Sequence, residues 1–215
     1  MPTEYFECRE RALLGDRFDA LYAAPQETAA RGVTVSALRA APEQFAAQAD
    51  FPVEPSPFCK AGFVVQDPAF KPGRHPYHHA GVFYSQEPSA SSAAPLLGVR
   101  PGMRVLDTCA APGGKSFAAA MQMENTGSIL SCDLHPHKIA LIEKNAARLG
   151  ISILKAETRS AAEFDPALEN GFDLVIADVP CSGLGVIRKK PDIRYKPLDA
   201  IERLPAVQTA ILENV

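Results

Sequence analysis

The second half of the chain alternates between continuous apolar runs and segments whose apolar residues recur at helical spacing. Four runs have the length and composition of buried strands: 103–110, 127–133, 151–157 and 172–180. Helical patterns occupy 115–124 and 136–150, the latter with a proline in its first turn and Gly150 in the position of a C-cap. A final helix is expected over 198–215, kinked at Pro205. This alternation predicts the α/β class, with a parallel sheet covered by helices on both faces.

The first half has shorter elements and more prolines. Its patterns predict short helices over 15–24 and 35–49 and short strands over 31–35 and 61–66. A further short helix in 85–102 is expected to stop at Pro101 and Gly102. We therefore predict a small α+β module over residues 1–95, followed by a larger α/β domain over residues 96–215.

Composition and charge narrow the class of protein. Of the 215 residues, 47% are hydrophobic, and no apolar run approaches the length of a membrane helix. The charged N-terminus does not resemble a signal peptide, so a soluble, cytoplasmic protein with no membrane partner is expected. The five cysteines are odd in number and lack zinc-site spacing, which predicts reduced thiols and no bound metal.

A net charge of −3 does not mark a nucleic-acid-binding protein, but basic residues gather locally. The segment 188–196 holds five of them, and a second cluster at 71–79 adds a lysine, an arginine and three histidines. Such clusters can bind phosphate, and solvated loops are an equal alternative for each cluster taken alone.

The stretch "DTCAAPGGKS" places a glycine turn between the first predicted strand of the α/β domain and its helix. Gly113 and Gly114 let a ligand approach the backbone at a helix N-terminus, although neither a phosphate loop nor a dinucleotide fingerprint is present. Asp133, 20 residues after Gly113, ends the next strand and can accept hydrogen bonds from both hydroxyls of a ribose. Because the turn has one basic residue, Lys115, S-adenosylmethionine suits it better than NAD or ATP. Helix capping by Asp133 and a solvated Lys115 are the alternatives.

Two longer motifs identify a family. "LDTCAAPGGKS" (106–116) and "ADVPCSGLGVIRKKPDIRYK" (177–196) resemble the signatures of the RsmB/RsmF (Nop/Sun) RNA cytosine-5 methyltransferases, and "HPYHHAGVFYSQEPSA" (75–90) resembles the RsmF-like bacterial branch. The resemblance implies a Rossmann-like fold that is incomplete at the C-terminus. It also implies that S-adenosylmethionine is bound by Cys109, Ala110, Ala111, Pro112, Gly113, Gly114, Lys115, Asp133, Glu157 and Asp178. Glu157 departs from the aspartate usual at its position.

Cytosine carbon 5 is a poor nucleophile, and addition of a thiolate to carbon 6 activates it. The resemblance implies that Asp178 stabilises the adduct and that Cys181 assists product release, while the nucleophile belongs to a later threonine–cysteine pair. No cysteine follows Cys181 in this sequence. A C-terminally truncated, catalytically incomplete member of the family is therefore expected.

The implied partner is structured RNA, ribosomal or transfer, bound by a monomer whose basic segment follows the RNA backbone. The residues of that segment are Arg188, Lys189, Lys190, Arg194 and Lys196. A non-catalytic RNA- or cofactor-binding remnant is one alternative. A DNA cytosine-5 methyltransferase, suggested by the terminal "ENV", is another, although "ILENV" also continues a helical pattern. For His75, His78 and His79 an RNA- or loop-packing role is favoured over metal binding. Gln86 and Glu87 are expected to approach the cofactor or target base, or to cap a helix.

Overall fold

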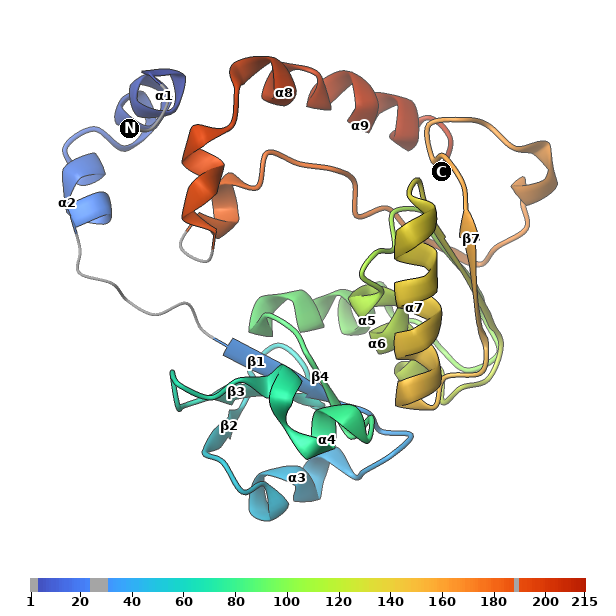
Figure 1. The fold of residues 1–215 in the computed structure, drawn as a ribbon. Helices are drawn as coiled ribbons and strands as arrows, with labels where there is room; N and C mark the ends of the chain where they lie inside the picture. Colours follow the sequence, from blue (N-terminus) through green and yellow to red (C-terminus); the bar gives the residue numbers. More distant parts are fainter. Residues whose placement is uncertain (1–3, 24–30, 188–189) are drawn as a thin grey trace. The chain divides into compact units, whose positions relative to one another are not determined.

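The structure, a computed structural model, describes residues 4–23, 31–187 and 190–215 (Figure 1). The chain forms two compact units. One unit combines residues 1–29 with 180–210, and the other combines residues 30–179 with 211–215. The second unit contains both β-sheets.

The first sheet is antiparallel, with strand order β2-β3-β1-β4. Its strands are β1 (Arg31–Val35), β2 (Val53–Pro55), β3 (Gly62–Val65) and β4 (Phe83–Ser85), and α3 (Pro42–Gln48), η1 (Pro72–Arg74) and α4 (Pro76–His79) connect them. Val33 lies opposite Phe63 and Val35 opposite Phe83, so these four side chains form one buried face with Phe45. This sheet, its connections and the following turn η2 (Pro88–Ser92), residues 31–92, are called the module below.

The second sheet is parallel, with strand order β7-β6-β5-β8. The strands are β5 (Arg104–Asp107), β6 (Ser128–Asp133), β7 (Leu154–Thr158) and β8 (Leu174–Ile176). Helices α6 (Gly114–Gln122) and α7 (Pro136–Leu149) make the first two crossovers, and α7 ends at Gly150 in the left-handed conformation as predicted. This arrangement confirms the Rossmann-like α/β fold.

The helices that connect the strands of the parallel sheet lie on one of its two faces. The crossovers run in one direction along the sheet, so right-handed connections place α6 and α7 on the same face, and Figure 1 shows α7 alongside β7. Within the described residues, the β7–β8 connection contributes the 3₁₀ turn η3 (Pro166–Leu168) and no α-helix. A cavity of about 380 Å³ lies against Leu106, Cys132 and Val175 on that side. The connections between these four strands therefore place helices on one face, and the C-terminal residues Glu213, Asn214 and Val215 line the cavity on the other side.

The other unit is helical in its described parts. It contains α1 (Glu4–Leu14), α2 (Arg17–Ala23), η4 (Leu184–Val186), η5 (Pro191–Tyr195), α8 (Leu198–Glu202) and most of α9 (Leu204–Leu212). The last two helices replace the single kinked helix expected over 198–215. Pro205 lies in the first turn of α9, where a missing N–H leaves no helical hydrogen bond unmade.

Two other predicted helices differ for local reasons. In 35–49 only Pro42–Gln48 is helical, because Pro42 suits a first turn and not a helix interior. The preceding Ser36 is buried instead, and its hydroxyl donates to Leu149 O at 3.1 Å. In 85–102, the 3₁₀ turn η2 (Pro88–Ser92) leads into α5 (Ala93–Leu97), which ends at Gly98 (φ 65°) before Pro101 is reached.

Candidate functional site

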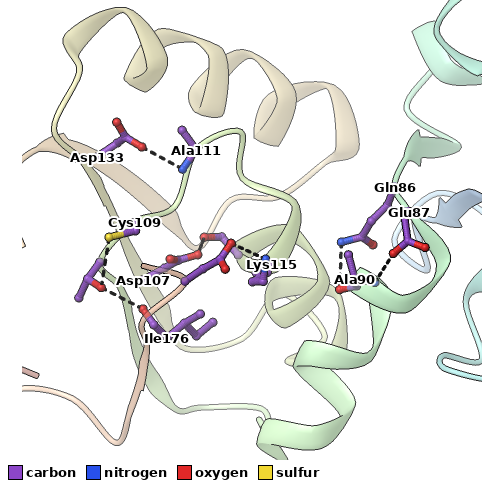
Figure 2. Close-up of polar contacts among 12 residues, drawn as sticks. Gln86, Glu87, Ala90, Asp107, Cys109, Ala111, Lys115, Asp133 and Ile176 are labelled. Carbon is purple, nitrogen blue, oxygen red and sulfur yellow. Dashed lines mark hydrogen bonds and ion pairs between the residues drawn. The ribbon is translucent and has the colours of Figure 1, made fainter. Parts of the chain in front are cut away.

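The carboxyl ends of β5, β6 and β8 lie at one edge of the parallel sheet, where the turn 108–113 leads into α6. Gly113 precedes the helix at φ 101°, a conformation that favours glycine, and a Cβ there would collide with the Phe117 ring. The glycine is therefore required by the turn itself. Figure 2 shows the turn residues Cys109 and Ala111 beside Asp107, Lys115 and Asp133.

Asp107, the last residue of β5, is fully buried beneath this turn. Ser116 Oγ donates to Asp107 Oδ2 at 2.6 Å, and Ser131 Oγ donates to Ser116 Oγ at 2.8 Å. Asp107 Oδ1 has no hydrogen-bond partner. Burial raises the pKa of this carboxyl to about 6, although the Ser116 hydrogen bond opposes the shift. Sequence reasoning gave Asp107 no role of its own; the acid that ends a continuous apolar strand was the available signal.

Lys115 and Asp178 are paired across the edge. Lys115 Nζ lies 2.5 Å from Asp178 Oδ2, with the two side chains 29% and 55% exposed. The ion pair joins the first turn of α6 to the segment after β8. Lys115 is therefore not simply solvated, and two residues predicted to bind the cofactor contact one another.

Asp133 ends β6 and is 7% exposed. Its Oδ2 accepts from the Ala111 amide at 3.3 Å, and its Oδ1 accepts from the His135 amide at 3.1 Å and lies 3.3 Å from Lys138 Nζ. The carboxylate thus contacts both the glycine turn and the start of α7. Ribose binding and helix capping are both compatible with this position.

Glu157 lies near the end of β7, opposite Cys132 in the register. Its carboxylate is 2.7 Å from Lys155 Nζ and 3.1 Å from Arg159 Nη2, and these hydrogen bonds lower its pKa. Glu157 is therefore ionised and already paired with two cations.

The two motif cysteines differ in environment. Cys109 is half-buried, and burial raises the pKa of its thiol, which suits a packing residue better than a nucleophile. Cys181 is exposed in the other unit, where Gln208 Nε2 donates to Pro180 O and Lys196 Nζ donates to Ser182 O, both at 2.8 Å. These two bonds hold the backbone on both sides of Cys181.

The basic segment is described in part, because Arg188 and Lys189 lie outside the described residues. Lys190 is exposed and Arg194 is half-buried, and Arg194 Nε donates to Pro191 O at 3.2 Å. Lys196 is turned toward the loop that it stabilises. The RNA-binding role of the segment stays a prediction.

The histidines and Gln86 contact other parts of the module. His75 lies 2.9 Å from Asp50 and caps α4 by accepting from the Tyr77 amide. Glu87 caps η2, as Figure 2 shows, while Gln86 hydrogen-bonds within the module. In residues 4–23, 31–187 and 190–215, no cluster of three or more His, Cys, Asp or Glu side chains could hold a metal ion. No helix in those segments is long and apolar enough to cross a membrane.

Two family models match the chain. The model of 16S rRNA methyltransferase RsmB/F matches residues 94–215, and the model of the N-terminal domain of 16S rRNA methyltransferase RsmF matches residues 1–88. Ribosomal RNA small subunit methyltransferase F of Escherichia coli O7:K1 is 34% identical over 221 aligned residues, covering 99% of this chain and 46% of that protein. The probable methyltransferase B of Bacillus subtilis 168 is 46% identical over 145 residues, covering 66% of this chain and 32% of that protein. The chain therefore spans half or less of the length of these relatives.

Solved structures give the same fold. A methyltransferase homologue from Pyrococcus horikoshii is 26% identical with a TM-score of 0.81, covering 99% of this chain and 68% of that one. NSun6 from the same organism, solved with SFG, has a TM-score of 0.83 at 17% identity and covers 99% of this chain and 79% of that one.

Proposed function

Because the chain belongs to the family of 16S rRNA methyltransferases RsmB/F, we propose that it holds the S-adenosylmethionine site of an RNA cytosine-5 methyltransferase. The observation that supports this most directly is the position of Asp133, a nearly buried carboxylate that contacts the glycine turn at the carboxyl edge of the sheet. Ligands of open α/β sheets bind at this edge.

The charges at the edge suit this cofactor. S-adenosylmethionine has a cationic ammonium, a cationic sulfonium and a ribose diol, and it has no phosphate. The edge presents the carboxyl groups of Asp107, Asp133 and Asp178 against two nearby lysines, and both ammonium groups are already paired, Lys115 with Asp178 and Lys138 with Asp133. The free Oδ1 of Asp107 adds a buried acceptor without a partner. A polyphosphate would meet repulsion from the same three acids.

In the proposed site, Asp133 accepts hydrogen bonds from the ribose, and the first amides of α6 face the ligand. Cys109 to Gly114 form the surrounding turn, and Glu157 is the third-strand contact. The bound cofactor supplies a methyl group on an electrophilic sulfonium. Asp178 is proposed to hydrogen-bond to the cytosine ring when the Lys115 ammonium releases or shares it.

Cys181 is proposed to assist release of the methylated base. An exposed thiol in a loop held by backbone hydrogen bonds is accessible for that role. The nucleophile that adds to carbon 6 is assigned by the resemblance to a later threonine–cysteine pair, and these 215 residues contain no cysteine after Cys181. We therefore expect them to bind cofactor without methylating RNA.

The substrate is proposed to be ribosomal RNA in the cytoplasm, in keeping with the names of the relatives, and the protein is proposed to act as a monomer. The segment with Lys190, Arg194 and Lys196 would contact the RNA backbone, together with Arg188 and Lys189. A division into a module over 1–95 and a methyltransferase domain over 96–215 is part of the same proposal.

Calorimetric titration with S-adenosylmethionine tests the cofactor site. Replacing a charged acceptor of two hydroxyls should weaken binding by about 10- to 100-fold, so Asp133→Ala is expected to show that loss. Asp67→Ala is the matched control, because Asp67 makes the same local contact, accepting from the amide two residues ahead at 2.8 Å, but lies in the module. Equal binding by the Asp133 variant, or no binding by the folded wild-type chain, would contradict the proposal.

The alternative function is a cofactor- or RNA-binding remnant of the family. A methyl-transfer assay on ribosomal RNA, with the gene's full open reading frame as comparison, separates the two. Methylation by the product of the full open reading frame supports the enzyme, and cofactor binding without methylation by that product supports the remnant.

A further inference from the structure

A buried tyrosine of the module contacts the first turn of α6. Tyr84, in β4, is 5% exposed, and its hydroxyl lies 3.2 Å from Gly114 O and 3.1 Å from Gln86 Oε1. The single phenolic hydrogen can be donated to either acceptor. Burial raises the pKa of this phenol, so the group remains a neutral donor. A hydrogen bond to Gly114 O therefore links the module to the glycine turn.

Gln86 is held by the module on its other side. Thr34 Oγ1 donates to Gln86 Oε1 at 2.8 Å. Gln86 Nε2 donates to Ala90 O at 3.4 Å, as Figure 2 shows. These two hydrogen bonds hold the side-chain amide of Gln86 beside Tyr84. A Cβ on Gly114 would lie only 3.2 Å from Gln86 Nε2. Glycine at position 114 thus makes room for the module, a reason separate from the approach of a ligand.

The hydrogen bond from Tyr84 to Gly114 O also affects the amide of the next residue, Lys115. Gly114 C=O and Lys115 N–H belong to the same planar peptide unit. The Lys115 amide is among the first amides of α6, which have no acceptor within the helix. A bond that fixes Gly114 O therefore also fixes the direction of an amide that faces the ligand edge.

We propose that Tyr84 and Gln86, with Thr34 behind them, are positioning residues for the cofactor site. The inference rests on the proposed function, since it takes S-adenosylmethionine to be the ligand of the turn. The module is then a structural part of the cofactor site, in addition to any contact it makes with RNA. The residues act through the backbone of Gly114 and Lys115.

Removal of the hydroxyl alone tests the inference. Tyr84→Phe keeps the ring and its edge-on packing against Phe117, whose centroid is 5.9 Å away. The control is Tyr77→Phe, because Tyr77 packs on the phenylalanine core of the same module. Loss of one net hydrogen bond should weaken S-adenosylmethionine binding about fivefold in the Tyr84 variant. No change is expected in the control.

Hydrogen exchange separates positioning from a general loss of structure. In the ligand-free Tyr84→Phe chain, the amides of the first turn of α6 should exchange faster, while those of β1 and β3 keep their wild-type rates. Two substitutions of Thr34 add a further test. Thr34→Val removes the hydroxyl that holds Gln86 and should weaken binding as Tyr84→Phe does, whereas Thr34→Ser retains the hydroxyl and should keep wild-type affinity.

Two results would overturn the inference alone: wild-type affinity in Tyr84→Phe, or weaker affinity accompanied by faster exchange throughout the module. A folded wild-type chain that binds no S-adenosylmethionine would instead reject the proposed function, and the inference with it. Wild-type binding, measured first, distinguishes the two failures.

Discussion

Asp107 offers a prediction whose magnitude follows from the structure. Its ordinary pKa of 3.8 is raised to about 6 by burial, while the Ser116 hydrogen bond opposes the shift. A carboxyl that binds its proton more tightly in the folded state stabilises the fold in acid and loses that contribution as pH rises. The shift corresponds to about 3 kcal/mol of unfolding free energy, lost progressively between pH 4 and 6.

Comparison with Asp107→Asn isolates this group from the other carboxylates. Glu157, with a lowered pKa, contributes in the opposite direction, and its effect is the same in both chains. The unfolding free energy of the wild type minus that of the variant should therefore fall by about 2.5 kcal/mol from pH 4 to pH 7. The side-chain amide introduced by Asp107→Asn changes stability by an amount that does not depend on pH, so it does not affect the pH dependence of the difference.

Urea unfolding followed by circular dichroism at several pH values measures the difference, and an NMR titration of the Asp107 carboxyl measures the pKa directly. A difference that does not change with pH, together with a carboxyl that titrates near 4, would refute the reasoning. It would show that the free Oδ1 is solvated in solution or that Lys115 stabilises the charge.

Two substitutions, each with a control, test the backbone conformation of the glycine turn and the hydrogen bond between the module and α7. Gly113→Ala should lower the unfolding free energy by about 1–3 kcal/mol, because φ is 101° and the new Cβ would collide with Phe117. Gly73→Ala is the control: its new Cβ has open space around it, so the unfolding free energy should change by less than about 0.5 kcal/mol. Ser36→Ala removes a buried hydrogen bond from the module to Leu149 O in α7, and this should lower the unfolding free energy by about 1–2 kcal/mol. Ser92→Ala removes an exposed hydrogen bond from a hydroxyl to a carbonyl and should leave the unfolding free energy nearly unchanged. Urea unfolding checks both pairs, and equal losses within a pair would contradict the role assigned to burial or backbone conformation.

Local patterns predicted most elements of the parallel sheet and failed where tertiary contacts compete. The helix at 136–149 has its proline and its terminal glycine in the predicted positions. By contrast, 35–41 has helical spacing but is not helical, because Ser36 is buried against Leu149, a residue far away in sequence. The sequence pattern also did not show that the β7–β8 connection contains a 3₁₀ turn and no α-helix within the described residues.

For the candidate site, too, the sequence predicted the position of the residues but not their contacts. Strand–helix alternation and the motifs were sufficient to predict that Asp133, Asp178 and the glycine turn would gather at one edge, because parallel strands end together. The chemical pairings at that edge could not be predicted. Lys115 and Asp178 are 63 residues apart, and spacing alone gives no reason for their contact.

The sequence by itself determined the fold class, the family and the edge where the candidate residues gather, since these follow from periodicity and from contiguous motifs. Only the tertiary structure decided that Asp107 is buried with Ser116 and Ser131, and that Tyr84 of the module contacts Gly114. The physical reason is that hydrogen-bond partners and burial depend on which surfaces pack together. The hydrogen bond from Tyr84 spans 30 residues of chain and joins a strand of the antiparallel sheet to the first turn of α6, so no local pattern records it.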